Sequence, residues 1–240
     1  MATRVALKAI GKRVAGVIVA AGEGRRMGTP GSKAFLPING IPIVVYAIRP
    51  FEACSRVQSL YPVLREDDVH AWRSEILKKF PFKKMKPPVV GGSSRQESVR
   101  LGLESIREDI DIVLIHDGVR PFVGARVLER LLATMEETQA AVLAVPAKET
   151  MKIVDSSGHV LETPARKALW QIQTPQAFEY SMVLAAHHKA LADGITATDD
   201  ATLVERLGVP VKIVQGSYRN IKITTNEDLI TAQSLLKEEE

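Results

Sequence analysis

The chain has 240 residues, of which 45% are hydrophobic and 25% charged, and its formal net charge is +4. These values predict one soluble globular domain over residues 1–240 and exclude a disordered chain, and no apolar run reaches the roughly 18 residues that a membrane span requires. The scattered positive charge disfavours nucleic-acid binding, and the single cysteine, Cys54, excludes an intrachain disulfide, so we expect a reducing, cytoplasmic compartment.

Apolar strands alternate with amphipathic helices along most of the chain. Strands are predicted at 14–21, 55–64, 87–90, 111–116, 140–146 and 211–214. Helices are predicted at 41–51, 69–80, 94–106, 127–138, 180–193, 199–207 and 226–236. Because the strands read as buried on both faces, this alternation predicts an α/β fold with a mainly parallel sheet flanked by helices.

The segment 148–173 interrupts this alternation. A turn at 155–158 separates two short apolar runs at 151–154 and 160–163, which predicts a β-hairpin. An antiparallel excursion from a parallel domain often contacts a partner, so we expect a β-arm here.

A loop rich in glycine and arginine follows the first predicted strand. Residues 20–28 read AAGEGRRMG, and Lys33 lies a few residues further on. Glycines at the end of a buried strand let backbone N–H groups approach an anion, and the basic side chains suit a triphosphate. A P-loop is excluded because no Gly-Lys-Ser/Thr closes the pattern. A dinucleotide loop with a displaced third glycine and a purely structural glycine turn stay open.

This loop and six later stretches resemble, in order and spacing, the 2-C-methyl-D-erythritol 4-phosphate cytidylyltransferase family. The later stretches are 91–99 (GGSSRQESV), 116–121 (HDGVRP), 150–152 (TMK), 169–176 (LWQIQTPQ), 198–201 (TDDA) and 220–224 (NIKIT). The resemblance covers nearly the whole chain. It implies a Rossmann-like nucleotidyltransferase fold and the transfer of CMP from CTP to 2-C-methyl-D-erythritol 4-phosphate, with release of pyrophosphate, in the non-mevalonate isoprenoid route.

The resemblance also implies roles for individual residues. Arg26 and Lys33 match residues that stabilise charge on the triphosphate, and Asp117, with Arg120 beside it, matches an acidic residue near the ribose and the Mg²⁺-bound phosphates. The positions that match CTP contacts are Ala20, Ala21, Gly22, Gly92 and Ser98. The positions that match sugar-phosphate contacts are Thr150, Arg166, Thr174 and Lys222, of which Arg166 and Lys222 aim the phosphate. A homodimer that exchanges its β-arms is implied as well.

Each assignment has a simpler structural interpretation. Asp117 could cap a helix, Arg166 could be a solvated charge, and Lys222 alternates with isoleucines as on the exposed face of a strand. We expect 198–200 to act at least partly as a helix N-cap and His116 to be a packed histidine rather than a base. No base is required, because the incoming phosphate is already ionised at neutral pH.

One departure from the family pattern concerns the end of the glycine loop. The family usually has Pro-Lys-Gln where this chain has Ser32, Lys33 and Ala34. The loss of proline is expected to make the loop more mobile without nucleotide. Two other functions stay open: a cytidylyltransferase for ribitol 5-phosphate or another polyol phosphate, and a non-catalytic nucleotide-binding regulator.

Overall fold

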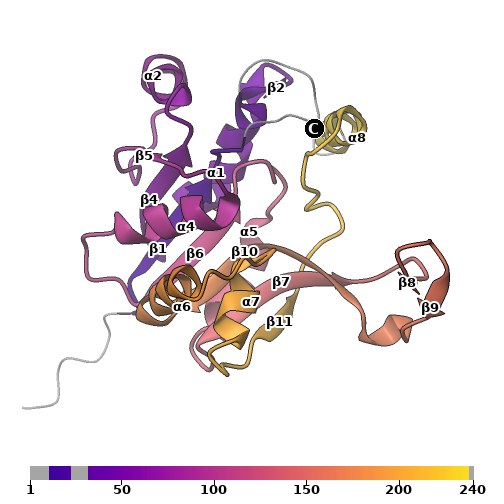
Figure 1. The fold of residues 1–240 in the computed structure, drawn as a ribbon. Helices are drawn as coiled ribbons and strands as arrows, with labels where there is room; N and C mark the ends of the chain where they lie inside the picture. The colour runs from indigo at the N-terminus through magenta and orange to yellow at the C-terminus, as the bar shows by residue number, and fades with distance from the viewer. Residues whose placement is uncertain (1–10, 23–31, 238–240) are drawn as a thin grey trace, which may run out of the picture.

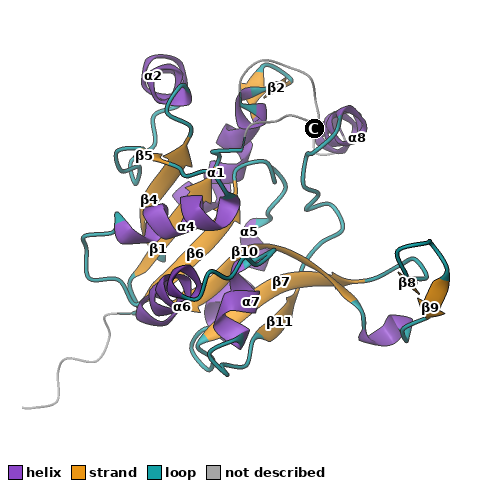
Figure 2. Cartoon of the chain, viewed as in Figure 1, coloured by secondary structure: helices purple, strands orange, loops and turns teal. Residues whose placement is uncertain are grey.

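The computed structural model describes residues 11–22 and 32–237 (Figure 1). Its centre is a seven-stranded sheet in the order β11, β7, β10, β6, β1, β4, β5 (Figure 2). The strands are β1 (Val14–Val19), β4 (Val57–Leu64), β5 (Val89–Val90), β6 (Ile112–Asp117), β7 (Ala140–Pro146), β10 (Trp170–Glu179) and β11 (Lys212–Gln215). β10 is antiparallel to both neighbours, and the other pairings in this sheet are parallel. The predicted mainly parallel sheet is therefore confirmed.

Helices cover both faces of this sheet. One face carries α1 (Ile43–Ala53) and α5 (Ala125–Thr134), and the other carries α4 (Arg95–Glu104), α6 (Tyr180–Ala192) and α7 (Asp200–Glu205). Because strand side chains alternate, Ile18 and Leu114 belong to the first core, whereas Val17 and Ile115 belong to the second. All four are fully buried, and burial of such an aliphatic side chain stabilises by about 1.5–3 kcal/mol.

Three smaller units complete the body. A continuous helical stretch, made of α2 (Asp68–Ala71), the π-helical turn η3 (Trp72–Ile76) and α3 (Leu77–Lys79), replaces the predicted helix at 69–80. β2 (Pro37–Ile38) and β3 (Ile41–Pro42) form a hairpin whose turn residues, Asn39 and Gly40, have φ of 49° and 76°. Positive φ at both positions is typical of tight two-residue hairpins. α8 (Asn226–Lys237) packs on this hairpin in a cluster of Ile38, Ile223 and Ala232.

The chain leaves the body as an arm between β7 and β10 (Figure 1). The arm contains β8 (Ile153–Val154), β9 (Val160–Glu162) and the 3₁₀ turn η4 (Arg166–Ala168). β8 and β9 pair antiparallel, which confirms the predicted hairpin. Leu161 is 67% exposed and Val160 is 56% exposed, so the arm presents apolar side chains to its surroundings.

β10 and the segment around Lys222 also differ from the sequence analysis, as does the unpredicted hairpin of β2 and β3. β10 was not predicted, because Gln173, Thr174 and Pro175 interrupt the apolar pattern of this strand. The placement of Lys222 on a strand was wrong, since it lies in an irregular segment between β11 and α8. Within the described ranges, no helix combines the length and the apolar character needed to cross a membrane.

Candidate active site

The predicted site residues of the body gather at the edge of the sheet where the parallel strands end. The chain passes from β1 to β4 on one side and later returns to β6 on the other side of β1. Open α/β sheets bind ligands at such a switch point, in the crevice beyond the carboxyl ends of the strands. The segments that follow β1, β5, β6 and β11 all reach this crevice.

The first of two adjoining cavities has a volume of about 650 Å³. Its lining includes Ala20, Ala21, Gly22, Lys33, Gly91, Gly92, Ser98, Asp117 and Lys222. A Cβ atom at Gly91 would lie 2.5 Å from Cβ of Ala21 and 2.8 Å from Oγ of Ser98. Glycine is therefore required where the segment after β5 passes the segment after β1.

The N-terminus of α4 fixes the shape of this cavity. Oγ of Ser94 accepts a hydrogen bond from N of Glu97 at 3.1 Å, and the Glu97 carboxylate accepts from N of Ser93 at 2.8 Å. The Ser98 hydroxyl donates to O of Ser94 at 2.8 Å and accepts from N of Gly92 at 3.1 Å. These bonds satisfy N–H groups at the start of the helix and hold the glycine turn against its first turn.

Asp117, at the end of β6, lies among three cationic side chains. Its Oδ1 accepts from Nε of Arg95 at 2.9 Å, and its Oδ2 lies 2.9 Å from Nζ of Lys222 and 3.6 Å from Nε of Arg120. Burial alone raises the pKa of Asp117, but the charges of Arg95, Lys222 and Arg120 outweigh it and hold that pKa well below its usual range. Asp117 is therefore ionised across the physiological range. It is not a helix cap, because the next helix begins only at Ala125.

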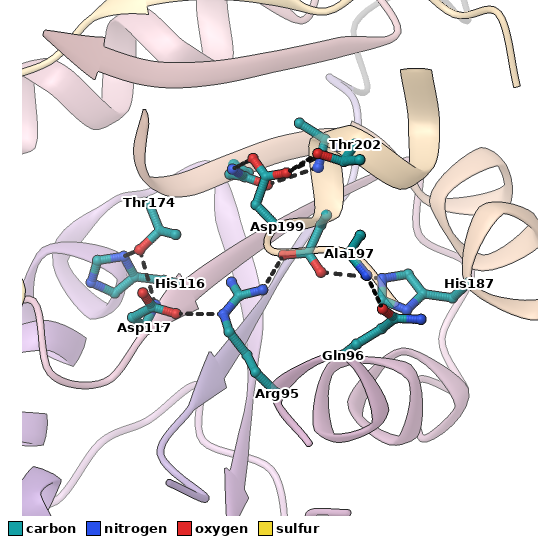
Figure 3. Close-up of polar contacts among 12 residues, drawn as sticks. Arg95, Gln96, His116, Asp117, Thr174, His187, Ala197, Asp199 and Thr202 are labelled. Carbon is teal, nitrogen blue, oxygen red and sulfur yellow. Dashed lines mark hydrogen bonds and ion pairs between the residues drawn. The ribbon is translucent and has the colours of Figure 1, made fainter. Parts of the chain in front are cut away.

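Arg95 links Asp117 to a second buried carboxylate, that of Asp200 on α7 (Figure 3). Nη1 of Arg95 donates to Oδ2 of Asp200 at 2.9 Å, and Oδ1 of Asp200 lies 3.2 Å from Nε2 of His187. Burial lowers the pKa of Arg95, but its two carboxylate partners raise it further, so the guanidinium stays charged. The same ion pair holds the pKa of Asp200 below its usual range against the effect of burial.

The second cavity, of about 440 Å³, lies on the other side of this ion-pair chain. Its lining includes Arg120, Thr174, Gln176, Thr198, Asp199, Thr202 and Glu205. Arg95, Asp117 and Lys222 line both cavities, so they mark the boundary where molecules in the two cavities would meet.

Hydrogen bonds determine the state of His116. Its Nε2 lies 3.1 Å from the carbonyl O of Arg120, which can only accept, so Nε2 carries the proton. Burial lowers the pKa of His116 to about 4, so the ring is neutral and Nδ1 accepts from the Thr174 hydroxyl, 3.0 Å away. That hydroxyl also accepts from N of Asp117 at 3.0 Å. His116 is fully buried, which confirms the packed histidine expected from the sequence.

The residues that follow the glycine loop are anchored in the body. The Ser32 hydroxyl donates to O of Ala20 at 3.2 Å, a bond that the family's proline could not make. Ala34 is 1% exposed, and Nζ of Lys33 lies 3.5 Å from O of Thr224. Lys33 therefore begins the short turn η2 (Lys33–Phe35) from a position fixed on both sides.

Two predicted site residues that the structure describes, Thr150 and Arg166, do not join these cavities. Thr150 and Arg166 lie on the arm, outside the lining of both cavities, and Nη1 of Arg166 donates to O of Lys148 at 3.3 Å. Arg26 lies outside the described residues. Asp199 accepts from N of Thr202 at 3.1 Å, so the expected N-cap of α7 is confirmed.

Sequence reasoning assigned no role in the site to Arg95, and it gave Asp200 only a part in the expected helix N-cap at 198–200. Arg95 lies in the stretch 91–99 that resembles the family, and this resemblance was the one sequence feature that pointed to it. Its partner Asp200 is 105 positions away. Nothing in the spacing of the two residues indicates that they meet.

Asp117 is the carboxylate that a Mg²⁺ ion at the boundary of the two cavities would contact. Among the residues that the structure describes, no three or more His, Cys, Asp or Glu side chains form a cluster that could hold a metal. Asp117 is the carboxylate at the cavity boundary, and both of its oxygens already face cations. Mg²⁺ is often bound through one or two carboxylates together with substrate phosphates, which these residues fit.

The fold, with two cavities that meet at a cluster of cationic side chains, is that of a nucleotidyltransferase. The family model of 2-C-methyl-D-erythritol 4-phosphate cytidylyltransferase matches residues 14–238. The enzyme of that name from Geobacter metallireducens is 44% identical over 225 residues, 92% of this chain and 97% of the relative. The one from Syntrophus aciditrophicus is 43% identical over 228 residues, 95% of this chain and 97% of the relative.

Solved structures agree. A crystal structure of 4-diphosphocytidyl-2C-methyl-D-erythritol synthase from Anaerococcus prevotii superposes with a TM-score of 0.84 at 33% identity, covering 95% of this chain and 97% of the other. The cytidylyltransferase from Thermus thermophilus gives a TM-score of 0.74 at 30% identity, covering 94% of this chain and 99% of the other. The chain belongs to the 2-C-methyl-D-erythritol 4-phosphate cytidylyltransferase family, as the sequence motifs indicated.

Proposed function

We propose that the two adjoining cavities divide the family's reaction, the first binding CTP and the second binding 2-C-methyl-D-erythritol 4-phosphate. As a member of this family, the chain is a CTP-dependent cytidylyltransferase of the non-mevalonate isoprenoid route. One observation carries the division: Arg95, Asp117 and Lys222 line both cavities, so a triphosphate in one and a phosphate in the other would meet at cationic side chains.

The CTP half uses small residues and fixed charge. The lining of the first cavity includes the small residues Ala20, Ala21, Gly22, Gly92 and Ser98. These residues would receive the pyrimidine base of CTP. Lys33, which lines the same cavity, and Arg26 neutralise charge on the triphosphate. Arginine and lysine stabilise the charge that builds on the α-phosphate and the departing pyrophosphate.

The acceptor half uses Thr174 and Lys222 from the body and Thr150 and Arg166 from an arm. A phosphate oxygen of the acceptor forms the new bond to the α-phosphorus of CTP while the bond to pyrophosphate breaks. Because this oxygen is already ionised, the protein needs to align it and to neutralise charge rather than to remove a proton. Arg120, which lines the second cavity, contributes further positive charge there.

Mg²⁺ enters this proposal with the nucleotide. Asp117 would contribute one carboxylate oxygen to a metal bound mainly by the triphosphate, where the ion offsets phosphate charge. Asp117 would then exchange part of its contact with Lys222 for the metal.

The active species is a homodimer in which each arm completes the partner's site. The arm carries exposed apolar side chains, such as Leu161, and places Arg166 outside both cavities of its own chain. Both observations favour a second copy of this chain as the occupant of the arm's surface.

A panel of substrates tests the function. Pyrophosphate release is measured with CTP, UTP, ATP or GTP and with either 2-C-methyl-D-erythritol 4-phosphate or ribitol 5-phosphate. We expect turnover with CTP and the erythritol phosphate, and little with the other pairs. Preferred turnover of ribitol 5-phosphate in direct competition would reassign the acceptor. No turnover with any pair, in protein whose circular dichroism shows a folded chain, would leave only a nucleotide-binding role.

A further inference from the structure

Arg95 stands at the boundary of the two cavities with part of its guanidinium unused. Nε donates to Asp117 and one N–H of Nη1 donates to Asp200, both at 2.9 Å. Arginine has five N–H donors. No residue that the structure describes accepts a hydrogen bond from Nη2, and 26% of the side chain is exposed. The remaining donors are therefore available to a molecule in the cavities that Arg95 lines.

The two carboxylates fix the direction of this guanidinium. Asp117 is held by the end of β6 and Asp200 by the first turn of α7, and both are nearly fully buried. Because two carboxylates accept from different nitrogens of the planar guanidinium, the guanidinium of Arg95 has little freedom to rotate. A lysine could not replace it, because one ammonium cannot reach both carboxylates and a third acceptor with the same geometry.

The local charge balance favours an anion at this place. Arg95, Lys222 and Arg120 carry three positive charges around the negative charges of Asp117 and Asp200. These five ion-paired side chains together carry one excess positive charge, and the further carboxylates of the second cavity, Asp199 and Glu205, lie outside this group. The excess lies where the two phosphate-bearing substrates would meet.

We propose that Arg95 is a further catalytic residue, whose unused N–H groups donate to a phosphate oxygen at the junction of the two cavities. Asp200 is a positioning residue, because its carboxylate accepts from Nη1 of Arg95 and so fixes the orientation of the guanidinium. The inference rests on the proposed division of CTP and acceptor between the cavities. Asp200 directly follows Asp199, which lines the acceptor cavity, so α7 links the wall of that cavity to the orientation of Arg95.

The test compares Arg95→Ala with Arg100→Ala. Arg100 lies on the same helix, pairs with Glu104 at 2.8 Å, and lines neither cavity, which makes it a matched control. We expect Arg95→Ala to lower kcat by roughly 10²–10³-fold, with a smaller change in KM for CTP, as for loss of one group that stabilises developing charge. Arg100→Ala should keep kcat within a few-fold of the wild type.

Chemical rescue separates catalysis from a structural role. Guanidinium at tens of millimolar, compared with NaCl at the same ionic strength, should restore part of the kcat of Arg95→Ala and leave the wild type and Arg100→Ala unchanged. Should Arg95→Ala fail to fold, Arg95→Lys serves instead, with an expected loss in kcat of at least about tenfold. Asp200→Asn should lower kcat more than it raises KM for CTP.

Two results would overturn the inference while leaving the proposed function in place. In the first, the wild type turns over and Arg95→Ala has the same kcat as Arg100→Ala. In the second, the Arg95→Lys chain is folded and has full activity. Absence of turnover in the wild type would instead contradict the proposed function itself.

Discussion

His116 shows how the burial of one side chain makes stability depend on pH. Its pKa is lowered from 6.5 to about 4 by burial, so between these values the unfolded chain binds a proton that the folded chain does not. The free energy of unfolding therefore rises with pH across this window. The contribution linked to His116 is fully present above pH 6.5 and is lost as the pH falls toward 4. The linked loss amounts to roughly 3 kcal/mol.

The prediction concerns His116→Asn. Its free energy of unfolding, from urea titrations at several pH values, should fall less steeply between pH 7 and pH 4.5 than that of the wild type, by about 2–3 kcal/mol in total. The other titrating groups are shared, so they cancel in the comparison. Parallel pH curves for the two proteins would contradict the neutral, buried state of His116.

Lys33 gives a second prediction for a single residue. Lys33→Ala should lower kcat by roughly 10²–10³-fold and raise KM for CTP by a smaller factor, because the contact proposed for Lys33 with the triphosphate would strengthen as charge develops. Lys212→Ala removes a lysine that is exposed on β11 and lines neither cavity, so steady-state kinetics should not change. An effect on KM alone would argue against the role of Lys33.

At the scale of elements, local rules predicted most helices and strands but not β10. The amphipathic helix predicted at 94–106 is α4, and its N-cap Ser94 accepts from N of Glu97. β10 was missed because polar residues fill its middle, and its pairing with β7 is broken between Ile172 and Gln176. Those polar side chains can be buried because they bond to residues far away in the sequence, as Thr174 does to His116. No local sequence pattern encodes such partners.

The cap of α4 yields a prediction for an element. Ser94→Ala should lower the free energy of unfolding by about 1 kcal/mol and weaken CTP binding, because it removes the bond from N of Glu97 to Oγ of Ser94 and so loosens the first turn of α4, which carries Ser98 at the cavity wall. Ser234→Ala, which removes a hydroxyl on the exposed side of α8, should change neither quantity by a comparable amount. Chemical denaturation and calorimetric titration with CTP measure the two effects. Unchanged CTP binding in Ser94→Ala would contradict the link between cap and cavity.

At the scale of the whole molecule, the sequence motifs were sufficient for the family, and the fold placed the body residues of the site together. The position of Arg166 could not be derived from one chain, since the site it is proposed to serve belongs to a second copy. An equal mixture of Arg166→Ala and Lys33→Ala chains, unfolded and refolded together, should regain about a quarter of wild-type activity. Each heterodimer then contains one intact site. Activity no higher than the sum of the two separate variants would indicate that every chain builds its own site.

β10 begins on the arm at Trp170 and ends in the centre of the sheet at Glu179, between β6 and β7. The arm is therefore not an appendage that can be trimmed, since cutting its return path removes a central strand. The tip turn at 155–158 is where the chain can be opened, to insert a fluorophore or an affinity tag, or to split the protein into two complementing fragments. A label placed there would lie outside the lining of both cavities and would report on the proposed meeting of two chains.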